Sequence, residues 1–358
     1  MSDIEFNPLG TDGFEFVEYT APSKEGIDSL KKLFASLGFS EVAKHRSKDA
    51  VLFRQGDINF IVNAEPYTHF EAFAQAHGPC ACAMAFRVQD ANKAMAHAVA
   101  NGAVAFEGKA GYMELNIPAV YGIGNSVLYF VDRYTDTNNI YNTDFEFYDS
   151  VDKHPKGAGL YEIDHLTHNV ARGNMDKWAG FYERIGNFRE IRYFDIEGKL
   201  TGLVSRAMTA PCGKIRIPIN ESSDDKSQIE EFLREYRGEG IQHIALSTEN
   251  IYETVSQLRD SGMKFMDTPD TYYEQLNDRV PGHGENIQEL KSRRILLDGA
   301  PVEGDGILLQ IFTDTVIGPI FFEIIQRKGN EGFGEGNFKA LFESIELDQI
   351  RRGVIADA

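Results

Sequence analysis

The chain repeats itself, and this internal similarity is the feature that most restricts its fold. Residues 13–19 alternate like a strand and have a counterpart at 162–168. Each segment is followed by an amphipathic helical stretch that ends at a glycine-containing stop, over 29–39 and 175–188. Two consecutive halves built on the same plan are therefore expected.

The remaining segments of the two halves also correspond in order. The pairs are a hairpin at 50–62 with 201–219, a strand running into a helix at 84–97 with 244–257, and a closing strand at 127–131 with 320–325. This pattern predicts an α+β protein of two tandem domains, each made of paired βαβββ units whose curved sheet or open barrel surrounds a cavity.

The domain boundary is expected near 150–159, where Asp, Lys, Pro and Gly concentrate. We predict an N-terminal, metal-free domain over 1–152 and a C-terminal, metal-binding domain over 153–358. Residues 337–352 have helical spacing and no counterpart in the first half, so they predict an additional C-terminal helix.

Length and charge exclude several classes of function. The 358 residues suit about two domains. The formal net charge is −19, and no Lys/Arg cluster forms a basic stripe, which argues against a nucleic-acid partner. No apolar run approaches the ~20 residues that span a bilayer. Three cysteines and no secretory leader predict a cytoplasmic protein without membrane association.

Comparison of the halves isolates three polar residues in the second half. The alignment sets His165 opposite Phe16, His243 opposite Ala83, and Glu323 opposite Phe130. Each of the three lies within an apolar strand and is expected to face the cavity. His168 is an odd number of residues beyond His165, so it should point to the opposite face and is not counted as a ligand.

Two imidazoles and one carboxylate form the ligand set of non-haem Fe(II) oxygenases. A lone carboxylate in an apolar cavity is costly unless it is paired or bound to metal. The open positions of the ion could take a 2-oxo acid and O₂. Two other interpretations remain open: a hydrolytic zinc set, for which no His-Glu-x-x-His helix is found, and an ion pair of Glu323 with Arg327 or a lysine.

Four motifs resemble those of the 4-hydroxyphenylpyruvate dioxygenase family. They are Asp-His-Leu-Thr-His-Asn at 164–169, Gly-Ile-Gln-His-Ile-Ala at 240–245, Phe-Phe-Glu-Ile-Ile-Gln-Arg at 321–327, and the tail at 332–345. The resemblance extends over nearly the whole chain. It implies the vicinal-oxygen-chelate fold, one Fe(II) per chain held by His165, His243 and Glu323, and a homo-oligomer, dimeric or tetrameric.

The resemblance also implies a reaction in tyrosine catabolism. 4-Hydroxyphenylpyruvate and O₂ would give homogentisate and CO₂ by oxidative decarboxylation, ring hydroxylation and side-chain migration. Eight residues would contact the substrate or surround the metal: Ser205, Asn220, Gln228, Gln242, Gln310, Phe321, Phe338 and Phe342. Gln310 and Phe342 are expected to act in catalysis, and the C-terminal helix is expected to gate the cavity. Gln242 precedes a strand ligand, so it should face away unless the strand is distorted.

Three alternatives to this function stay open. Hydroxymandelate synthase has the same fold, ligands and substrate but oxidises the benzylic carbon; the segment 218–220 and the Phe338/Phe342 pair favour the homogentisate branch. A non-catalytic small-molecule-binding protein of the same fold would need no metal. A ring-cleaving extradiol dioxygenase would need an acid/base histidine near the metal, and none is located in the sequence.

Overall fold

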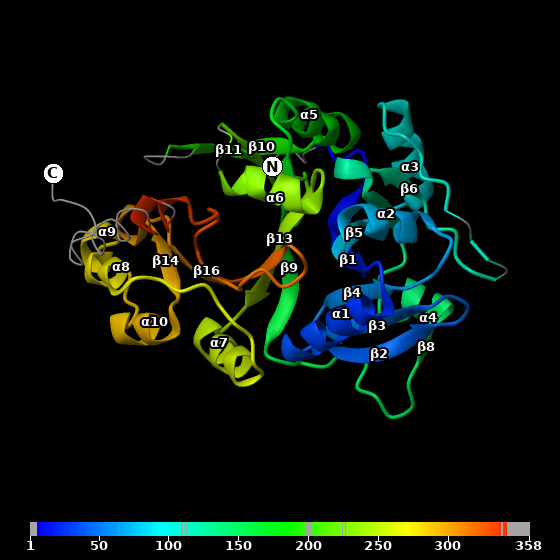
Figure 1. Ribbon diagram of the computed structural model, residues 1–358. Helices are drawn as coiled ribbons and strands as arrows, with labels where there is room; N and C mark the ends of the chain where they lie inside the picture. The colour runs from blue at the N-terminus through cyan, green and yellow to red at the C-terminus, as the bar shows by residue number, and fades with distance from the viewer. Residues whose placement is uncertain are drawn as a thin grey trace.

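Each half of the chain builds one curved, eight-stranded sheet with helices packed on it, as the computed structural model shows (Figure 1). The structure describes residues 6–108, 110–111, 113–197, 202–223, 225, 227–337 and 339–341. The predicted α+β class with two repeated sheets is confirmed. In Figure 1 the first half lies on the right and the second on the left, with β9 running between them.

The first sheet has the order β6-β7-β5-β1-β4-β3-β2-β8. Its strands are β1 Thr11–Thr20, β2 Ser40–His45, β3 Ala50–Gln55, β4 Ile58–Asn63, β5 Cys80–Val88, β6 Ala119–Tyr121, β7 Val127–Val131 and β8 Phe145–Phe147.

The second sheet has the order β10-β11-β12-β9-β13-β16-β15-β14. Its strands are β9 Leu160–Val170, β10 Arg189–Glu197, β11 Gly202–Thr209, β12 Arg216–Ser222, β13 Gly240–Thr248, β14 Leu296–Gly299, β15 Ile307–Phe312 and β16 Phe321–Lys328.

Helices connect the strands and cover the sheets (Figure 1). They are α1 Lys24–Ser36, α2 His69–His77, α3 Ala91–Ala100, α4 Ile140–Asp144, α5 Met175–Gly186, α6 Gln228–Tyr236, α7 Ile251–Asp260, α8 Asp270–Glu274, α9 Leu276–Arg279 and α10 Ile287–Arg293, with 3₁₀ turns η1 Ile123–Asn125 and η2 Pro301–Glu303. Asp90 caps α3 and Asn250 caps α7, each by accepting a hydrogen bond from a backbone N–H of the first turn.

The central pairings of the two sheets are the same. β1 pairs antiparallel with β5 and parallel with β4, and β9 pairs antiparallel with β13 and parallel with β12. Two βαβββ units thus join through their first strands in each half. The first sheet departs from this plan at one edge, where the short strand β8 pairs with β2.

The registers correct one alignment made from the sequence. Ala85 pairs with Tyr129 in the first sheet, and Ala245 pairs with Glu323 in the second. Glu323 therefore corresponds to Tyr129, and its alignment with Phe130 was wrong. A shift of one residue reverses the face that a strand residue occupies. The apolar run in β7 gave no polar alternation that could fix the register.

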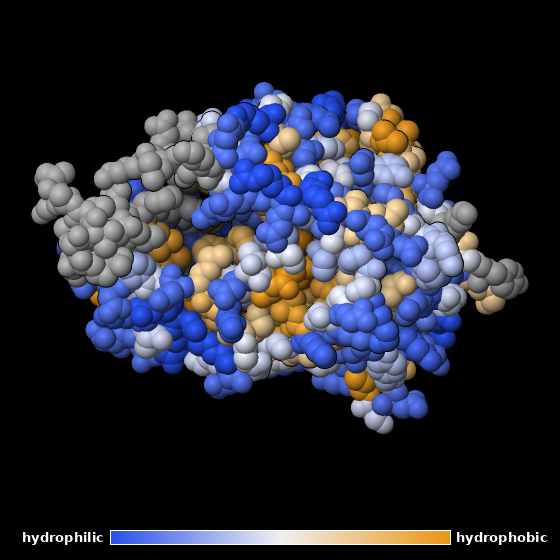
Figure 2. Space-filling model, viewed as in Figure 1, coloured by the Kyte–Doolittle hydropathy of each residue, from blue (hydrophilic) through white to orange (hydrophobic). Residues whose placement is uncertain are grey.

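The two halves share a hydrophobic core. The ring of Phe60 on β4 lies 6.1 Å from that of Phe322 on β16, and both residues are fully buried. The imidazole Nδ1 of His77 lies 2.8 Å from the carbonyl oxygen of Tyr236 across the same boundary. The face drawn in Figure 2 is mostly hydrophilic, with its hydrophobic surface gathered near the middle.

The C-terminal helix and the exact domain boundary stay predictions. The helix expected over 337–352 lies largely outside the described residues. The domain boundary near 152 stays a prediction, although the strands of the two sheets separate between Phe147 and Leu160. Within the described residues, no helix is both long and apolar enough to span a bilayer.

We expect Gly56→Ala to destabilise the contact between the halves. Gly56 has φ +55°, and an added Cβ would lie 2.6 Å from Cα of Tyr161. Gly102 is the matched control, because it also has positive φ but no described atom lies within 4 Å of its added Cβ. Urea unfolding should show a loss of about 1–2 kcal/mol for Gly102→Ala from backbone strain, and about 1–3 kcal/mol more for Gly56→Ala from overpacking. Equal losses would contradict this account of the junction.

Candidate metal centre

Three adjacent strands bring the predicted ligands together. His165 lies on β9, His243 on β13 and Glu323 on β16, and Ala245 of the middle strand pairs with both His165 and Glu323. Oε2 of Glu323 lies 3.2 Å from Nε2 of His165 and 3.3 Å from Nε2 of His243. The two Nε2 atoms are 3.4 Å apart. The three ligand atoms therefore form a nearly equilateral triangle.

The site is withdrawn from water. His165 and Glu323 are each 2% exposed, and the side chain of His243 is 12% exposed. Burial raises the pKa of Glu323, but the charge and hydrogen bonds of the two imidazoles outweigh it and lower that pKa to about 2. Burial also lowers the pKa of His243. The site thus holds an ionised carboxylate and favours a neutral imidazole at His243, as metal ligation requires.

Each ligand is held by a second side chain. Asp164 Oδ1 lies 2.7 Å from Nδ1 of His165, and Gln242 Oε1 lies 3.0 Å from Nδ1 of His243. When Nδ1–H of each imidazole donates to its partner's oxygen, the lone pair of each Nε2 is left for a metal ion. Gln310 Nε2 donates to Glu323 Oε1 at 3.0 Å, which leaves Oε2 as the free ligand atom.

Asp164 is in turn fixed by Arg327. The guanidinium donates from Nε to Oδ2 at 2.7 Å and from Nη2 to Oδ1 at 2.8 Å, and Asp164 is 3% exposed. These contacts outweigh the effect of burial and hold the pKa of Asp164 far below its usual range. Arg327 therefore forms its ion pair with Asp164, and the predicted ion pair between Arg327 and Glu323 was wrong.

Gln310 also belongs to a chain of hydrogen bonds. Its Oε1 accepts from Nδ2 of Asn337 at 2.8 Å, and Oδ1 of Asn337 accepts from the hydroxyl of Tyr272 at 2.6 Å. Gln310 and Asn337 are buried. The amide of Gln310 is thus oriented with its NH₂ group toward Glu323 by residues outside the triad.

The residues present fit a single divalent ion. Ligand atoms 3.2–3.4 Å apart are spaced as around one centre at metal–ligand distances of about 2.1 Å. Among the described residues, this trio is the one group of His, Cys, Asp and Glu that meets the geometry of a metal site. An imidazole-imidazole-carboxylate set on one face is the ligand type of non-haem Fe(II) oxygenases.

A cavity of about 60 Å³ adjoins the triad. Two of the predicted substrate residues, Ser205 on β11 and Asn220 on β12, line it. Small-molecule sites usually measure roughly 300–1,000 Å³. The cavity that the described residues enclose is smaller than this range.

Sequence reasoning missed two aromatic residues of this wall. Phe312, the last residue of β15, and Phe333, beyond β16, line the cavity, and the ring of Phe333 lies 5.3 Å from that of His165. Phe333 lies inside the tail motif at 332–345, which was the one available signal. Thr167, two residues after His165, also lines the cavity, as the two-residue period of a strand predicts.

The other predicted residues lie at different distances from the triad. Gln242 is the unpaired residue of a bulge between Ile241 and His243, so the strand is distorted and its amide reaches the neighbouring ligand. Phe321 stacks on His243 with ring centroids 5.0 Å apart. Gln242 and Phe321 therefore both contact the imidazole of His243.

The three remaining predicted residues are not seen in contact with the triad. Gln228 is exposed at the first position of α6, where Ser227 caps the helix, and is not among the residues that line the described cavity, so its contact with the substrate stays a prediction. Phe338 and Phe342 lie outside the described residues.

Known proteins resemble both halves of the chain. The family model described as hydroxyphenylpyruvate dioxygenase, N-terminal, matches residues 6–146. The model of the glyoxalase/bleomycin resistance protein/dioxygenase superfamily matches residues 162–280, which include His165 and His243. The repeated sheets and the triad thus define a protein of this superfamily.

Relatives that match nearly the whole chain identify the family within this superfamily. The chain is 73% identical to "Hemolysin VllY" of Vibrio vulnificus (strain CMCP6), over 98% of this chain and 99% of that protein. It is 67% identical to 4-hydroxyphenylpyruvate dioxygenase of Pseudomonas aeruginosa, over 98% of each chain. A mutant of 4-hydroxymandelate synthase from Streptomyces coelicolor has the same fold, with a TM-score of 0.80 at 24% identity over 95% of this chain and all of that one. The chain belongs to the 4-hydroxyphenylpyruvate dioxygenase family.

We expect Asp164→Asn to weaken metal binding. The amide preserves the shape of the side chain but removes the charge that fixes His165 and neutralises Arg327. Anaerobic titration of ferrous iron against a competing chelator should show an affinity reduced roughly tenfold to hundredfold. Glu162→Gln is the control, because Glu162 is exposed on the same strand. Equal affinities of the two variants would refute the role given to Asp164.

Proposed function

We propose that the protein converts 4-hydroxyphenylpyruvate and O₂ to homogentisate and CO₂ with one Fe(II) per chain. The observation that carries this proposal is the buried His165-His243-Glu323 triangle beside a cavity lined by Ser205 and Asn220. The name of the relative from Pseudomonas aeruginosa, which is 67% identical, supports the same substrate. The protein is proposed to act as a cytoplasmic homo-oligomer in tyrosine catabolism.

The proposed reaction balances without a separate reductant. Decarboxylation of the 2-oxo acid supplies two electrons, one oxygen atom of O₂ enters the new carboxylate, and the other enters the ring. Bound iron would supply the site at which the 2-oxo acid and O₂ react. Three protein ligands leave coordination positions for both reactants.

The protein's own residues have distinct proposed tasks. Asp164 and Gln242 keep both imidazoles in the tautomer that offers Nε2, and Gln310 orients Glu323. Phe312 and Phe333 provide flat apolar walls for an aromatic ring and exclude water. Ser205 and Asn220 offer hydrogen bonds to the polar end of the substrate. Phe338 and Phe342, which lie outside the described residues, are proposed to contact the substrate, and Phe342 is proposed to act in catalysis.

Product identity separates the proposal from its nearest alternative. A hydroxymandelate synthase would use the same substrates and ligands, and the solved structure of one resembles this chain in fold alone. The purified protein with ferrous iron should consume O₂ when 4-hydroxyphenylpyruvate is added, and mass spectrometry should identify homogentisate. Hydroxymandelate as the main product would overturn the ring-hydroxylation step. A lack of O₂ consumption by iron-loaded protein would overturn the enzymatic function and favour the non-catalytic binding protein.

Glu323→Ala is expected to abolish turnover while the protein stays folded. The substitution removes the one carboxylate ligand, and it also removes a buried charge whose isolation is costly. O₂ uptake and circular dichroism measure the two properties. Glu25→Ala, at an exposed position of α1 in the first half, is the control and should retain activity. Turnover by Glu323→Ala at the rate of the unaltered protein would reject the ligand assignment.

Ser205→Ala is expected to weaken catalysis by a moderate factor. Loss of one hydrogen bond worth about 1 kcal/mol should lower kcat/KM roughly fivefold. Ser261→Ala, an exposed position at the end of α7, serves as the control. Steady-state kinetics in which Ser205→Ala matches the control would show that this hydroxyl does not contact the substrate.

A further inference from the structure

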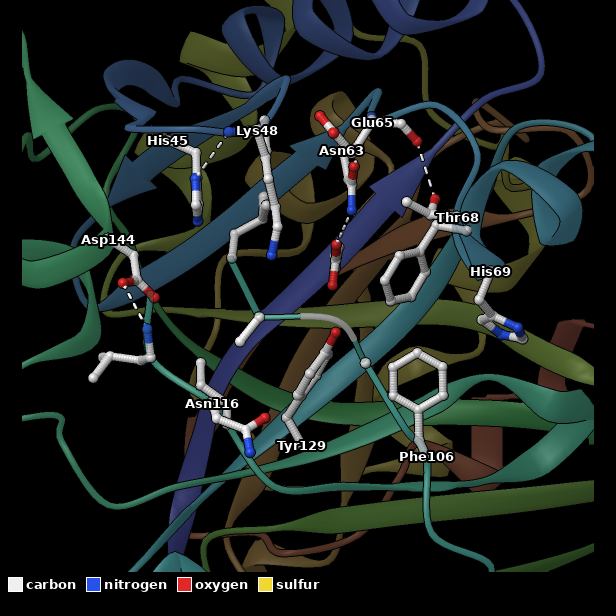
Figure 3. Close-up of a pocket in the computed structure, with 18 of the residues that line it drawn as sticks. His45, Lys48, Asn63, Glu65, Thr68, His69, Phe106, Asn116, Tyr129 and Asp144 are labelled. Carbon is white, nitrogen blue, oxygen red and sulfur yellow. Dashed lines mark hydrogen bonds between the residues drawn. The ribbon is translucent and has the colours of Figure 1, made fainter. Parts of the chain in front are cut away.

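The first half contains a cavity larger than the one beside the triad. Its volume is about 330 Å³, which falls within the usual range of roughly 300–1,000 Å³ for small-molecule sites. The proposed reaction makes no use of it. The wall combines aromatic rings with a few inward-pointing polar groups (Figure 3).

This cavity occupies the place that the metal centre has in the second half. Phe16 pairs with Ala85, and Ala85 pairs with Tyr129, in the same register that joins His165, Ala245 and Glu323. Phe16 and Tyr129 line the cavity, with ring centroids 5.5 Å apart. Aromatic rings thus stand where the second half has two metal ligands, and the hollow of the sheet is retained.

A buried carboxyl group faces into this cavity. Glu18 lies two residues beyond Phe16 on β1 and is 5% exposed. Its Oε1 accepts a hydrogen bond of 2.6 Å from Nδ2 of Asn63. No lysine or arginine in the described part of the chain lies within ion-pairing distance of it. Burial raises the pKa of Glu18 to about 7, against the hydrogen bond of Asn63 and the charge of Lys48.

The lysine of the cavity wall, Lys48, already forms an ion pair with an acidic residue. Lys48 lines the cavity, and its Nζ lies 2.9 Å from Oε2 of Glu114. Three further acidic residues, Glu65, Glu107 and Asp144, also line the cavity. The wall therefore has an excess of acidic groups, and Glu18 is the most buried of them. A buried carboxylate without a cationic partner is costly, so a ligand that supplies a cation is favoured.

The remaining groups suit an aromatic body. Tyr129 Oη makes no hydrogen bond within the described residues, and Figure 3 shows the side chains of Lys48, Asn63 and Tyr129 pointing toward a common space. The rings around this space belong to Phe16, Phe70, Phe106, Tyr121, Tyr129 and Phe145. Such rings pack against a planar ligand and attract a cation through their faces.

We propose that this cavity is a second ligand site that binds a small aromatic amine in its ammonium form. The ammonium would donate a charge-assisted hydrogen bond to Glu18, and its ring would pack among the aromatic residues of the wall. An aromatic carboxylate should not bind, because it would have to displace Glu114 from its ion pair with Lys48. It would also be repelled by the acidic groups of the wall. The inference depends on the first half alone and is independent of the triad.

The first experiment compares two probes of similar size and opposite charge. Titration calorimetry on the full-length, metal-free Glu323→Ala protein, in which the metal centre lacks its carboxylate ligand, should show saturable one-to-one binding of 2-phenylethylamine and none of 3-phenylpropionate. Binding of the acid as tightly as the amine, or no saturable binding of the amine, would overturn the proposal. Glu323→Ala should bind the amine as the unaltered protein does, which separates this cavity from the metal centre.

Glu18→Gln tests the proposed contact. Glutamine can still accept the hydrogen bond from Asn63 but has no charge. The affinity for 2-phenylethylamine should fall at least roughly tenfold, which corresponds to about 1.4 kcal/mol. Glu25→Gln is the matched control, because Glu25 is exposed on α1 and outside the cavity. An affinity of Glu18→Gln equal to that of the control would contradict the assignment.

A second variant tests the location without changing a charge. Ile117 is half-buried in the cavity wall, so Ile117→Trp should fill the space from its rim. This variant should lose amine binding. If Glu18→Gln does not fold, Ile117→Trp still tests whether the amine binds in this cavity. Retained binding in a folded Ile117→Trp protein would place the amine elsewhere and overturn the proposal.

Discussion

The carboxylate of Glu323 is buried, and its Oε2 lies 3.2 and 3.3 Å from the Nε2 atoms of two imidazoles. An isolated charge in such a place costs several kcal/mol, so the surrounding groups must compensate it. Several contacts of the second half surround this carboxylate. Adjacent strands supply the three ligand atoms, and Gln310 satisfies the carboxylate oxygen that does not face the imidazoles. Asp164 and Arg327 form a buried pair behind His165 and fix the imidazole nitrogen that faces Glu323.

The two halves use one scaffold for different chemistry. In both sheets the middle strands bring distant residues to one hollow face in the same register. The second half places ligands there and closes the space with Phe312 and Phe333. The first half has Phe16 and Tyr129 at the corresponding positions and a larger cavity, with an acid one strand period away at Glu18. The first repeat, which has aromatic rings in place of the ligands, thus keeps a hollow with a buried carboxyl group of its own.

The sequence was sufficient for the sheets and the triad because both depend on periodicity. A two-residue strand period and a repeated plan placed His165 and His243 on the cavity face. Periodicity fails where a strand is irregular: Gln242 reaches its neighbour only because of a bulge, which no local pattern showed. The apolar strand β7 likewise gave no signal against aligning Glu323 with Phe130. The inward direction of Glu18 was missed because a single acidic residue in an alternating strand is equally compatible with solvent.

One ferrous ion is proposed to lie between the two imidazole nitrogens and the carboxylate oxygen of the second half. Crystals of the protein loaded with Fe(II) under anaerobic conditions allow a direct test by anomalous diffraction at the iron edge. The account predicts one strong peak per chain at bonding distance from Nε2 of His165, Nε2 of His243 and Oε2 of Glu323. A peak at another group of side chains, or protein that takes up iron with no peak between these atoms, would contradict it.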